Sequence, residues 1–240
     1  MKRSSRLELI DAADAPPSEL CGALCEIELI NRALGGYRPS LEGVERLLPS
    51  GVRGFSILDV GCGCGDVMRR LVDWARRRRL HIRAVAIELS EAAVALARAE
   101  CADYPEIHVE RRNLFDLDAD RRFDIVHTSM MLHHMPDAAA VRRALVKMGQ
   151  LGRMGIVIND LHRHWMAWLG IHGLTRALSR NAFIRHDAPL SVARGFVRHE
   201  LLAAVRGAGF PRALIAWHWP FRWLVTIPLA DCSDRVGQAD

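Results

Sequence analysis

The sequence contains very little lysine. Only Lys2 and Lys147 occur, so the 33 Lys plus Arg residues are almost all arginine, set against 28 Asp plus Glu. The formal charge of +5 fits a nucleic-acid or membrane partner, and it fits equally an arginine-biased composition on ordinary solvated surfaces. Because no appended nucleic-acid-binding module is recognisable, we favour the second interpretation.

Paired cysteines and long apolar runs are also lacking. The six cysteines, the last of them Cys232, form no repeated Cys-x-x-Cys pair and no zinc-finger spacing, which predicts neither a disulfide framework nor a metal site. Reduced thiols in the cytoplasm fit best. Residues 1–17 carry no apolar core of signal-peptide length. The longest apolar stretch, 213–230, is interrupted by His218, Pro220 and Arg222, so no transmembrane helix is expected.

The rest of the composition is that of a folded domain. Hydrophobic residues make up 50% and charged residues 25% of the 240, close to the average for globular proteins. This length allows one large domain or two small ones. Since no internal repeat or low-complexity linker occurs, we expect a single domain over residues 1–240.

Short apolar runs alternate with amphipathic segments from residue 55 onward. The expected strands are residues 55–60, 82–87, 107–110, 123–128 and 155–159, and the expected helices are 66–77, 91–101 and 137–151. Alternation at this spacing indicates right-handed βαβ crossovers. It predicts an α/β fold with a parallel sheet that helices cover on both faces.

Two helical segments precede this alternation. Residues 18–34 and 40–48 carry apolar residues at helical spacing and are separated by a Gly-Gly-Tyr-Arg-Pro breaker. We assign residues 18–50 to an N-terminal helical lid and residues 55–160 to a cofactor-binding core.

Two further segments follow the core. Residues 161–189 break the alternation and are rich in His and Trp. We interpret them as a helical cap over the carboxyl edge of the sheet, with an ordinary surface helix as an equal alternative. Residues 190–240 are assigned to a last helix, 191–209, and an antiparallel edge hairpin formed by two apolar strands, 213–219 and 221–228.

A glycine-rich turn follows the first expected strand. Residues 57–66 read Ile-Leu-Asp-Val-Gly-Cys-Gly-Cys-Gly-Asp. Glycines let the backbone turn tightly and approach a ligand, and the following helix offers free N–H groups. The spacing is G-x-G-x-G after Asp59, whereas the dinucleotide fingerprint is G-x-G-x-x-G. An acid beside the turn would repel a phosphate and suits a ligand that carries a positive charge.

This turn and four later segments resemble, in order, the motifs of the class I S-adenosylmethionine-dependent methyltransferases. In that family the acid and glycines of the first motif surround the amino-acid end of the cofactor. Glu88 matches the acid that binds both ribose hydroxyls. Asn113 stands where the family usually has the Asp that recognises the adenine amino group, and its side-chain carbonyl can still accept that hydrogen bond. Residues 123–135 resemble the family's FDxVxxxxxLHH block, and residues 151–160 its fifth-strand block.

The resemblance implies a Rossmann-like, seven-stranded and mostly parallel sheet with an antiparallel edge hairpin. It also implies S-adenosyl-L-methionine as cofactor and S-adenosyl-L-homocysteine as product. The residues that we predict to bind the cofactor are Asp59, Gly61, Cys62, Gly63, Gly65, Glu88, Leu89, Asn113, Leu114, Thr128 and Ser129. Asp66 is left out, because an acid in the first turn of a helix is explained by the helix dipole alone.

Histidines and large apolar side chains are the candidates on the acceptor side. A histidine base suits deprotonation of a hydroxyl near neutral pH. The candidate catalytic residues are His134, His133 and His162. The candidate acceptor-binding residues are Tyr37, Met130, Met131, Trp165, Trp168 and His186. A purely structural role is the alternative for each of them.

The predicted function is O-methylation of a phenolic or polyketide-like natural product, because the sequence is similar to quinone and polyketide O-methylating groups. N- or C-methylation of a small molecule remains open. An RNA or protein methyltransferase is disfavoured, since residues 128–131 are not of the Asn-Pro-Pro-Tyr type. A nicotinamide-dependent oxidoreductase is a more distant alternative. No acid cluster follows Asp160, so no metal is predicted. A cytoplasmic monomer or homodimer is expected, with a small molecule as partner and neither nucleic acid nor membrane insertion.

Overall fold

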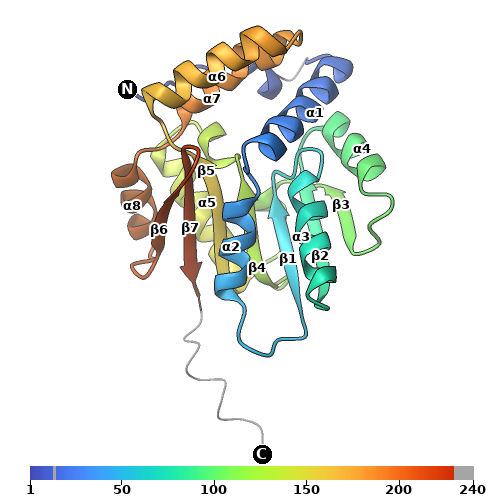
Figure 1. Ribbon diagram of the computed structural model, residues 1–240. Coiled ribbons are helices and arrows are strands. Elements are labelled where there is room, and N and C mark those ends of the chain that lie inside the picture. Colours follow the sequence, from blue (N-terminus) through green and yellow to red (C-terminus); the bar gives the residue numbers. More distant parts are fainter. Residues whose placement is uncertain (13–14, 230–240) are drawn as a thin grey trace, which may run out of the picture.

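The computed structural model describes residues 1–12 and 15–229, so Cys232 and the end of the predicted 190–240 segment lie outside the described residues. The strands are β1 (Gly54–Val60), β2 (His81–Glu88), β3 (Ile107–Arg111), β4 (Phe123–Ser129), β5 (Gly152–Leu161), β6 (Leu214–His218) and β7 (Arg222–Pro228). They form one sheet in the order β3-β2-β1-β4-β5-β7-β6, and β7 runs antiparallel to both its neighbours. The predicted α/β, Rossmann-like fold is confirmed (Figure 1).

Helices cover both faces of this sheet. They are α1 (Pro17–Ala33), α2 (Arg38–Leu47), α3 (Asp66–Arg77), α4 (Glu91–Glu100), α5 (Ala138–Leu151), α6 (Trp165–Leu178), α7 (Ala182–Arg194) and α8 (Arg198–Gly207). Apolar side chains of α2, α3 and α4 form one core with the sheet, and those of α5 and α8 form a second core on the opposite face. Among these helices none is long and apolar enough to cross a membrane.

The central strand shows why the sequence folds this way. Ile57 and Leu58 in β1 are both fully buried, and they belong to the two cores on opposite faces of the sheet. A strand that is buried on both faces needs a continuous apolar run rather than an alternating one. The pairing of β1 with β2 and β4 is parallel throughout, which brings the carboxyl ends of these strands to one edge.

Helices α1, α6 and α7 lie above that edge (Figure 1). Helix α7 packs against α6, α1 and the short 3-10 helix η1 (Leu9–Asp11). Two further 3-10 helices, η2 (Leu114–Asp116) and η3 (Leu132–His134), follow β3 and β4. The predicted cap segment, 161–189, therefore begins on the last residue of β5 and ends inside α7.

One predicted element is wrong. Residues 191–209 were expected to form a single helix, but α7 ends at Arg194 and α8 begins at Arg198. A Cβ on Gly195 would lie 2.7 Å from the carbonyl oxygen of Leu161, and the Phe196 N–H donates to that same oxygen. The Gly195 N–H still bonds to Ser191 in the last turn of α7, but the Phe196 N–H bonds to Leu161 at the end of β5 instead of to the preceding turn, and the helix therefore ends there.

Candidate active site

A cavity of about 730 Å³ lies between the carboxyl edge of the sheet and the cap helices. Its walls come from the glycine turn, the ends of β2 and β4, and helices η1, α1, α6 and α7. Most of the lining is apolar, with acidic groups and two histidines set into it. This volume falls in the range of about 300–1,000 Å³ that is typical of small-molecule sites.

The glycine turn has the geometry that its sequence predicts. Gly61, Gly63 and Gly65 have φ values of 72°, 55° and 76°, a region that other residues enter only with strain. A Cβ on Gly61 would lie 2.6 Å from Cγ of Met131. The turn thus brings bare backbone to the cavity wall. Gly65 does not line the cavity itself; it starts α3, and its N–H donates to the carbonyl of Cys62.

Asp59 lines the cavity at the end of β1 and is almost fully buried. Its Oδ1 lies 2.7 Å from Nδ1 of His127 on β4. A carboxylate only accepts hydrogen bonds, so this imidazole nitrogen donates. Nε2 of His127 contacts Oγ of Ser40 at 2.9 Å. A buried chain across β1, β4 and α2 therefore orients the Asp59 carboxylate.

Glu88 lies at the end of β2, beside the glycine turn. Its Oε2 accepts from the Gly63 N–H at 3.2 Å, and its Oε1 accepts from the N–H groups of Leu89 and Ser90 at 2.7 and 3.1 Å. Asn113 also lines the cavity, but its Oδ1 already accepts from the Phe115 N–H at 3.0 Å as the cap of η2. Its carbonyl keeps one further lone pair for a ligand.

Asp66 is a cavity residue that the sequence analysis left out. Its side chain is 8% exposed, and its Oδ2 accepts from the Tyr37 hydroxyl at 2.9 Å and from Nδ2 of Asn31 at 3.4 Å. Burial raises the pKa of Asp66 above its usual range. Its position directly after the glycine turn indicates a place at the cavity, although the helix dipole alone also explains an acid there.

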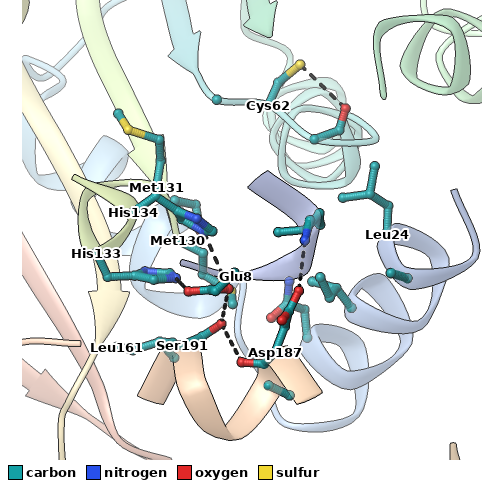
Figure 2. A pocket seen from close by; sticks show the side chains of 18 of the residues that line it. Glu8, Leu24, Cys62, Met130, Met131, His133, His134, Leu161, Asp187 and Ser191 are labelled. Atoms are coloured by element: carbon teal, nitrogen blue, oxygen red, sulfur yellow. Dashed lines mark hydrogen bonds and ion pairs between the residues drawn. The ribbon is translucent and has the colours of Figure 1, made fainter. Parts of the chain in front are cut away.

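Two histidines follow β4 on helix η3. His133 is buried and His134 is a quarter exposed. Nδ1 of His133 lies 2.7 Å from Oδ1 of Asp160, and Nδ1 of His134 lies 2.8 Å from Oδ2 of Asp11. Each ring therefore turns its Nε2 the other way, toward Glu8. Figure 2 shows the Glu8 carboxylate beside both imidazoles, next to the hydroxyl of Ser191.

The carboxylates and the imidazoles shift one another's pKa values. Burial alone would raise the pKa of Asp160 and of Asp11, but the neighbouring His133 and His134 outweigh it and lower both. Burial alone would lower the pKa of His134, but the hydrogen bond to Asp11 and the charge of Glu8 raise it. Opposite charges at hydrogen-bond distance have this effect because they favour the ionised forms.

Helix α7 holds this cluster together. Asp187 accepts from the N–H groups of Leu9 and Ile10, both at 2.9 Å, which fixes η1 and the preceding Glu8. Ser191 donates to Oε2 of Glu8 at 2.6 Å. Arg194 donates to the backbone carbonyls of the two histidines.

A match to a family model and a curated relative at 30% identity together show which family this site belongs to. Residues 57–152 match the model described as a methyltransferase domain, and that stretch contains the glycine turn, Glu88, Asn113 and both histidines of η3. The chain belongs to the class I S-adenosylmethionine-dependent methyltransferases. The cofactor of this methyltransferase is S-adenosyl-L-methionine. The chain's own geometry fits it, because the bare glycine backbone and the Asp59 and Glu88 carboxylates face one cavity.

Curated relatives of this methyltransferase include two ubiquinone biosynthesis O-methyltransferases. The one from Pseudomonas paraeruginosa (strain DSM 24068 / PA7) is 30% identical over 170 residues, which is 67% of this chain and 66% of the relative. The one from Albidiferax ferrireducens is 34% identical over 154 residues, 61% of this chain and 58% of the relative. The chain thus spans less than two thirds of the length of these relatives.

Solved structures share the fold of the methyltransferase. The magnesium protoporphyrin IX methyltransferase of Synechocystis PCC 6803, solved with bound S-adenosylhomocysteine, has a TM-score of 0.55 at 14% identity, with 81% of this chain and 84% of that chain covered. The citrinin polyketide synthase CMeT domain has a TM-score of 0.57 at 13% identity, covering 78% and 49%. At these identities the likeness concerns the fold alone.

The predicted cofactor-binding residues of the methyltransferase lie together, with two exceptions. Those that line the cavity are Asp59, Gly61, Cys62, Gly63, Glu88, Leu89, Asn113, Leu114 and Ser129. Gly65 lies behind the turn. Thr128 is fully buried, and its hydroxyl donates to the Val60 carbonyl at 2.9 Å, so its side chain ties β4 to β1.

The predicted acceptor-side residues of the methyltransferase divide into two groups. His133, His134, Met130 and Met131 line the cavity. His162 does not line it, and its Nδ1 accepts from Nε1 of Trp217 on β6 at 3.1 Å. Tyr37 also lies outside the lining, with its hydroxyl bound to Asp66.

The cap residues Trp165, Trp168 and His186 lie outside the cavity as well. Trp165 is 60% exposed, whereas Trp168 and His186 line a separate surface hollow. The cause is helical periodicity, because residues 166, 167, 170, 171 and 174 of α6 face the cavity and thereby turn the tryptophans away.

Proposed function

We propose that this methyltransferase transfers a methyl group to an oxygen of a small, largely apolar acceptor, with phenolic natural products as the acceptor class. The observation that carries the proposal is the position of the η3 histidines. His133 and His134 line the same cavity as the glycine turn, and apolar residues of the cap line it as well. A hydroxyl acceptor in this cavity would meet basic groups and few competing water molecules.

The cofactor's end of the cavity is formed by the glycine turn and two carboxylates. S-adenosyl-L-methionine, when bound, supplies an activated methyl group on a sulfonium. Asp59 suits the positively charged amino group of its amino-acid end, and Glu88 suits hydroxyls of its ribose, as the family resemblance implies. Both carboxylates are held by hydrogen bonds within the protein, so they need no reorganisation when the ligand arrives.

The acceptor's end is formed by the cap. Met130 and Met131 follow β4, and Leu24, Phe183 and Ile171 reach the cavity from α1, α7 and α6. An apolar wall of this kind binds a planar or hydrophobic molecule by burial of its surface. His134 is the first candidate to accept the hydroxyl proton, and His133 and Glu8 lie beside it.

The curated relatives and some of the solved structures of similar fold differ in the atom that they methylate. The curated relatives are named as O-methyltransferases of ubiquinone biosynthesis, which supports oxygen. Structures titled as carbon methyltransferases, such as that of DszA, share only the fold, at 18% identity and a TM-score of 0.53. Transfer to carbon or nitrogen is therefore the second candidate.

The test is an assay of methyl transfer from labelled cofactor to a panel of phenols, catechols and enols, with the products identified by mass spectrometry and NMR. We expect an O-methyl ether, with turnover lost in Glu88→Ala and reduced in His134→Ala. His199→Ala, at an exposed position of α8, is the matched control and should keep full activity. A product methylated only at carbon or nitrogen contradicts the proposal, and so does the absence of turnover with every acceptor.

The same proposal includes a cytoplasmic monomer or homodimer that acts without nucleic acid. The five cysteines among the described residues are all free thiols, which suits a reducing compartment. Sedimentation analysis and a gel-shift experiment at low salt test the oligomeric state and the absence of nucleic-acid binding. Binding that weakens steeply as salt is added would contradict the latter.

A further inference from the structure

Glu8, His133 and His134 bring three ligand-type atoms together on the cavity wall. One carboxylate oxygen and one imidazole nitrogen from each ring lie within 4.8 Å of one another. Nε2 of His133 lies 3.8 Å from Oε1 of Glu8, and Nε2 of His134 lies 4.0 Å from Oε2. Both separations are too long for hydrogen bonds.

Two of these atoms are buried without a hydrogen-bond partner. Oε1 of Glu8 and Nε2 of His133 make no hydrogen bond with any described residue. Their residues are only 3% and 1% exposed. Buried polar atoms are nearly always paired, because an unpaired one costs its full desolvation. Figure 2 shows the Glu8 carboxylate and the His133 ring turned toward each other across this gap. A ligand that satisfies both atoms at once therefore has to be a shared donor or a cation.

The opposite nitrogens of both rings are engaged by carboxylates. Asp160 contacts Nδ1 of His133, and Asp11 contacts Nδ1 of His134. A carboxylate on Nδ1 fixes the tautomer whose Nε2 lone pair is free. This carboxylate, imidazole and metal arrangement recurs in metalloproteins, since it orients the ring and raises its basicity.

We propose that Glu8, His133 and His134 form a binding site for one divalent transition-metal ion of the Zn²⁺ class. Two imidazoles and one carboxylate are the ligands that such borderline ions prefer, whereas Mg²⁺ and Ca²⁺ prefer oxygen ligands throughout. Ligand bonds of about 2.0–2.1 Å place two tetrahedral ligands about 3.3 Å apart. The separations of 3.8 and 4.0 Å run to the two different oxygens of Glu8, and one atom from each residue lies within 4.8 Å of the others, so the side chains have to move inward by up to about 1.5 Å to reach this geometry.

Charge around the cluster also suits a cation. The Glu8 carboxylate lies beside both rings, Asp160 contacts His133 and Asp11 contacts His134. Nε of Arg194 lies 3.4 Å from Oε1 of Glu8, which makes it the main competitor of an ion. This guanidinium is held primarily by backbone carbonyls of His133, His134 and Arg6, so it stays in place when Glu8 turns toward the rings.

Three protein ligands leave one coordination position open, as in catalytic rather than structural zinc sites. The three residues line the cavity, so the open position faces the acceptor's end. The further role of the ion, to hold an acceptor oxygen, rests on the proposed function; the metal site itself does not. With an ion bound, the two imidazoles no longer accept a proton, so the ion would replace His134 as the group that activates the acceptor hydroxyl.

The test uses the full chain freed of metal with a chelator and titrated with Zn²⁺ by calorimetry and with Co²⁺ by absorption spectroscopy. We expect one ion per chain. Co²⁺ should give weak ligand-field bands without the intense band of a thiolate ligand. Glu8→Gln and His134→Ala should weaken binding by at least 100-fold. Asp11→Asn, which keeps all three ligands, should weaken it by about 10–100-fold. His199→Ala should bind as wild type does.

Two results would overturn the site. One is a wild-type chain that binds no ion at micromolar concentration or binds it through thiolates. The other is unchanged affinity in Glu8→Gln and His134→Ala. S-adenosylhomocysteine binding and thermal unfolding of each variant report whether it is folded. If S-adenosylhomocysteine binds to the wild type and no metal does, the metal site is refuted and the proposed methyltransferase function is not. If the product does not bind the wild type, the proposed function fails independently.

Discussion

Nδ1 of His127 lies 2.7 Å from Oδ1 of Asp59, although 68 residues separate the two along the chain. The imidazole comes from β4 and the carboxylate from β1, which are paired in the sheet at this position. Because both side chains are buried, the bond fixes the direction in which the carboxylate faces the cavity. The residue that is expected to meet the cofactor's amino group is thus positioned by its neighbour strand.

Replacement of His127 tests this relationship. We expect His127→Ala to lower the affinity for S-adenosylhomocysteine by about 10-fold or more, since a lost hydrogen bond to a charged group is worth about 1.5–3 kcal/mol. Ser40→Ala removes only the contact to Nε2 and should have a smaller effect. Calorimetric titration of both variants measures the difference. Equal losses in the two variants would contradict the ranking.

Gly61 and Gly51 have similar positive φ values but different surroundings. Substitutions at the two positions therefore distinguish the effect of backbone conformation from the effect of close contact. Gly61 and Gly51 have φ values of 72° and 78°. A Cβ would meet Met131 at 2.6 Å in the first case and nothing within 4 Å in the second. Gly51→Ala should cost about 1–2 kcal/mol of unfolding free energy and leave cofactor binding intact.

Gly61→Ala should cost at least as much stability and also lose affinity for S-adenosylhomocysteine, because Met131 has to move into the cavity. The double variant Gly61→Ala with Met131→Ala should recover part of that affinity. Denaturant unfolding and calorimetry give the two readouts. If Gly61→Ala binds S-adenosylhomocysteine as wild type does, the close approach of Met131 to the turn is not needed for binding.

We expect Arg194 to stabilise the fold through the hydrogen bonds that its guanidinium donates. It is buried and donates to the backbone carbonyls of His133 and His134 at 3.0 and 2.7 Å. Arg194→Met should lower the unfolding free energy by about 2–4 kcal/mol, because the His134 carbonyl loses its donor and the His133 carbonyl keeps only the Arg3 guanidinium at 3.3 Å. Arg198→Met, at an exposed position of α8, is the control. Thermal unfolding of both variants tests this, and similar melting temperatures would refute it.

The surroundings of His162 predict that the stability of the protein depends on pH. Burial, followed by the charges of His164 and Arg163, lowers the pKa of His162 below its ordinary value of 6.5. Its Nδ1 also accepts from Trp217, which requires the unprotonated nitrogen. The neutral form is therefore favoured in the folded state. Its contribution to stability is present above the unfolded pKa and is lost as pH falls through the folded pKa.

We expect the melting temperature of wild type to exceed that of His162→Ala near pH 7.5, and the gap to narrow as pH falls below 6.5. The fluorescence of Trp217 should change over the same range. His199→Ala serves again as control and should keep a constant offset from wild type. A gap that is independent of pH would show that the imidazole does not titrate in this way.

The local sequence was sufficient for the core. Continuous apolar runs, amphipathic segments and the glycine turn carry their physical cause within a few residues. The strands, the helices around them and the positive φ values of the turn could therefore be predicted. The helix expected over residues 191–209 could not, because Phe196 hydrogen-bonds to Leu161 and Gly195 packs closely against it, and that contact crosses more than 30 positions.

The direction of the cap side chains also could not be predicted from the local sequence. Trp165, Trp168 and His186 have the composition of a binding wall, but the turn of α6 and α7 points them outward. Helical spacing alone would have divided α6 into two faces. Which face meets the cavity depends on how α6 packs on α7.

By itself the sequence determined the fold class and the place of the glycine turn at the carboxyl edge of the sheet, since strand ends and a glycine turn are local features, and the family resemblance implied the cofactor. Only the tertiary structure decided which side chains lie around the two histidines of η3. Glu8 and Asp11 precede the fold's first long helix and reach His133 and His134 across more than 120 positions. Asp187 and Ser191 on α7 hold them there. No local pattern marks these four residues, because their roles follow from packing between segments that are distant in the chain.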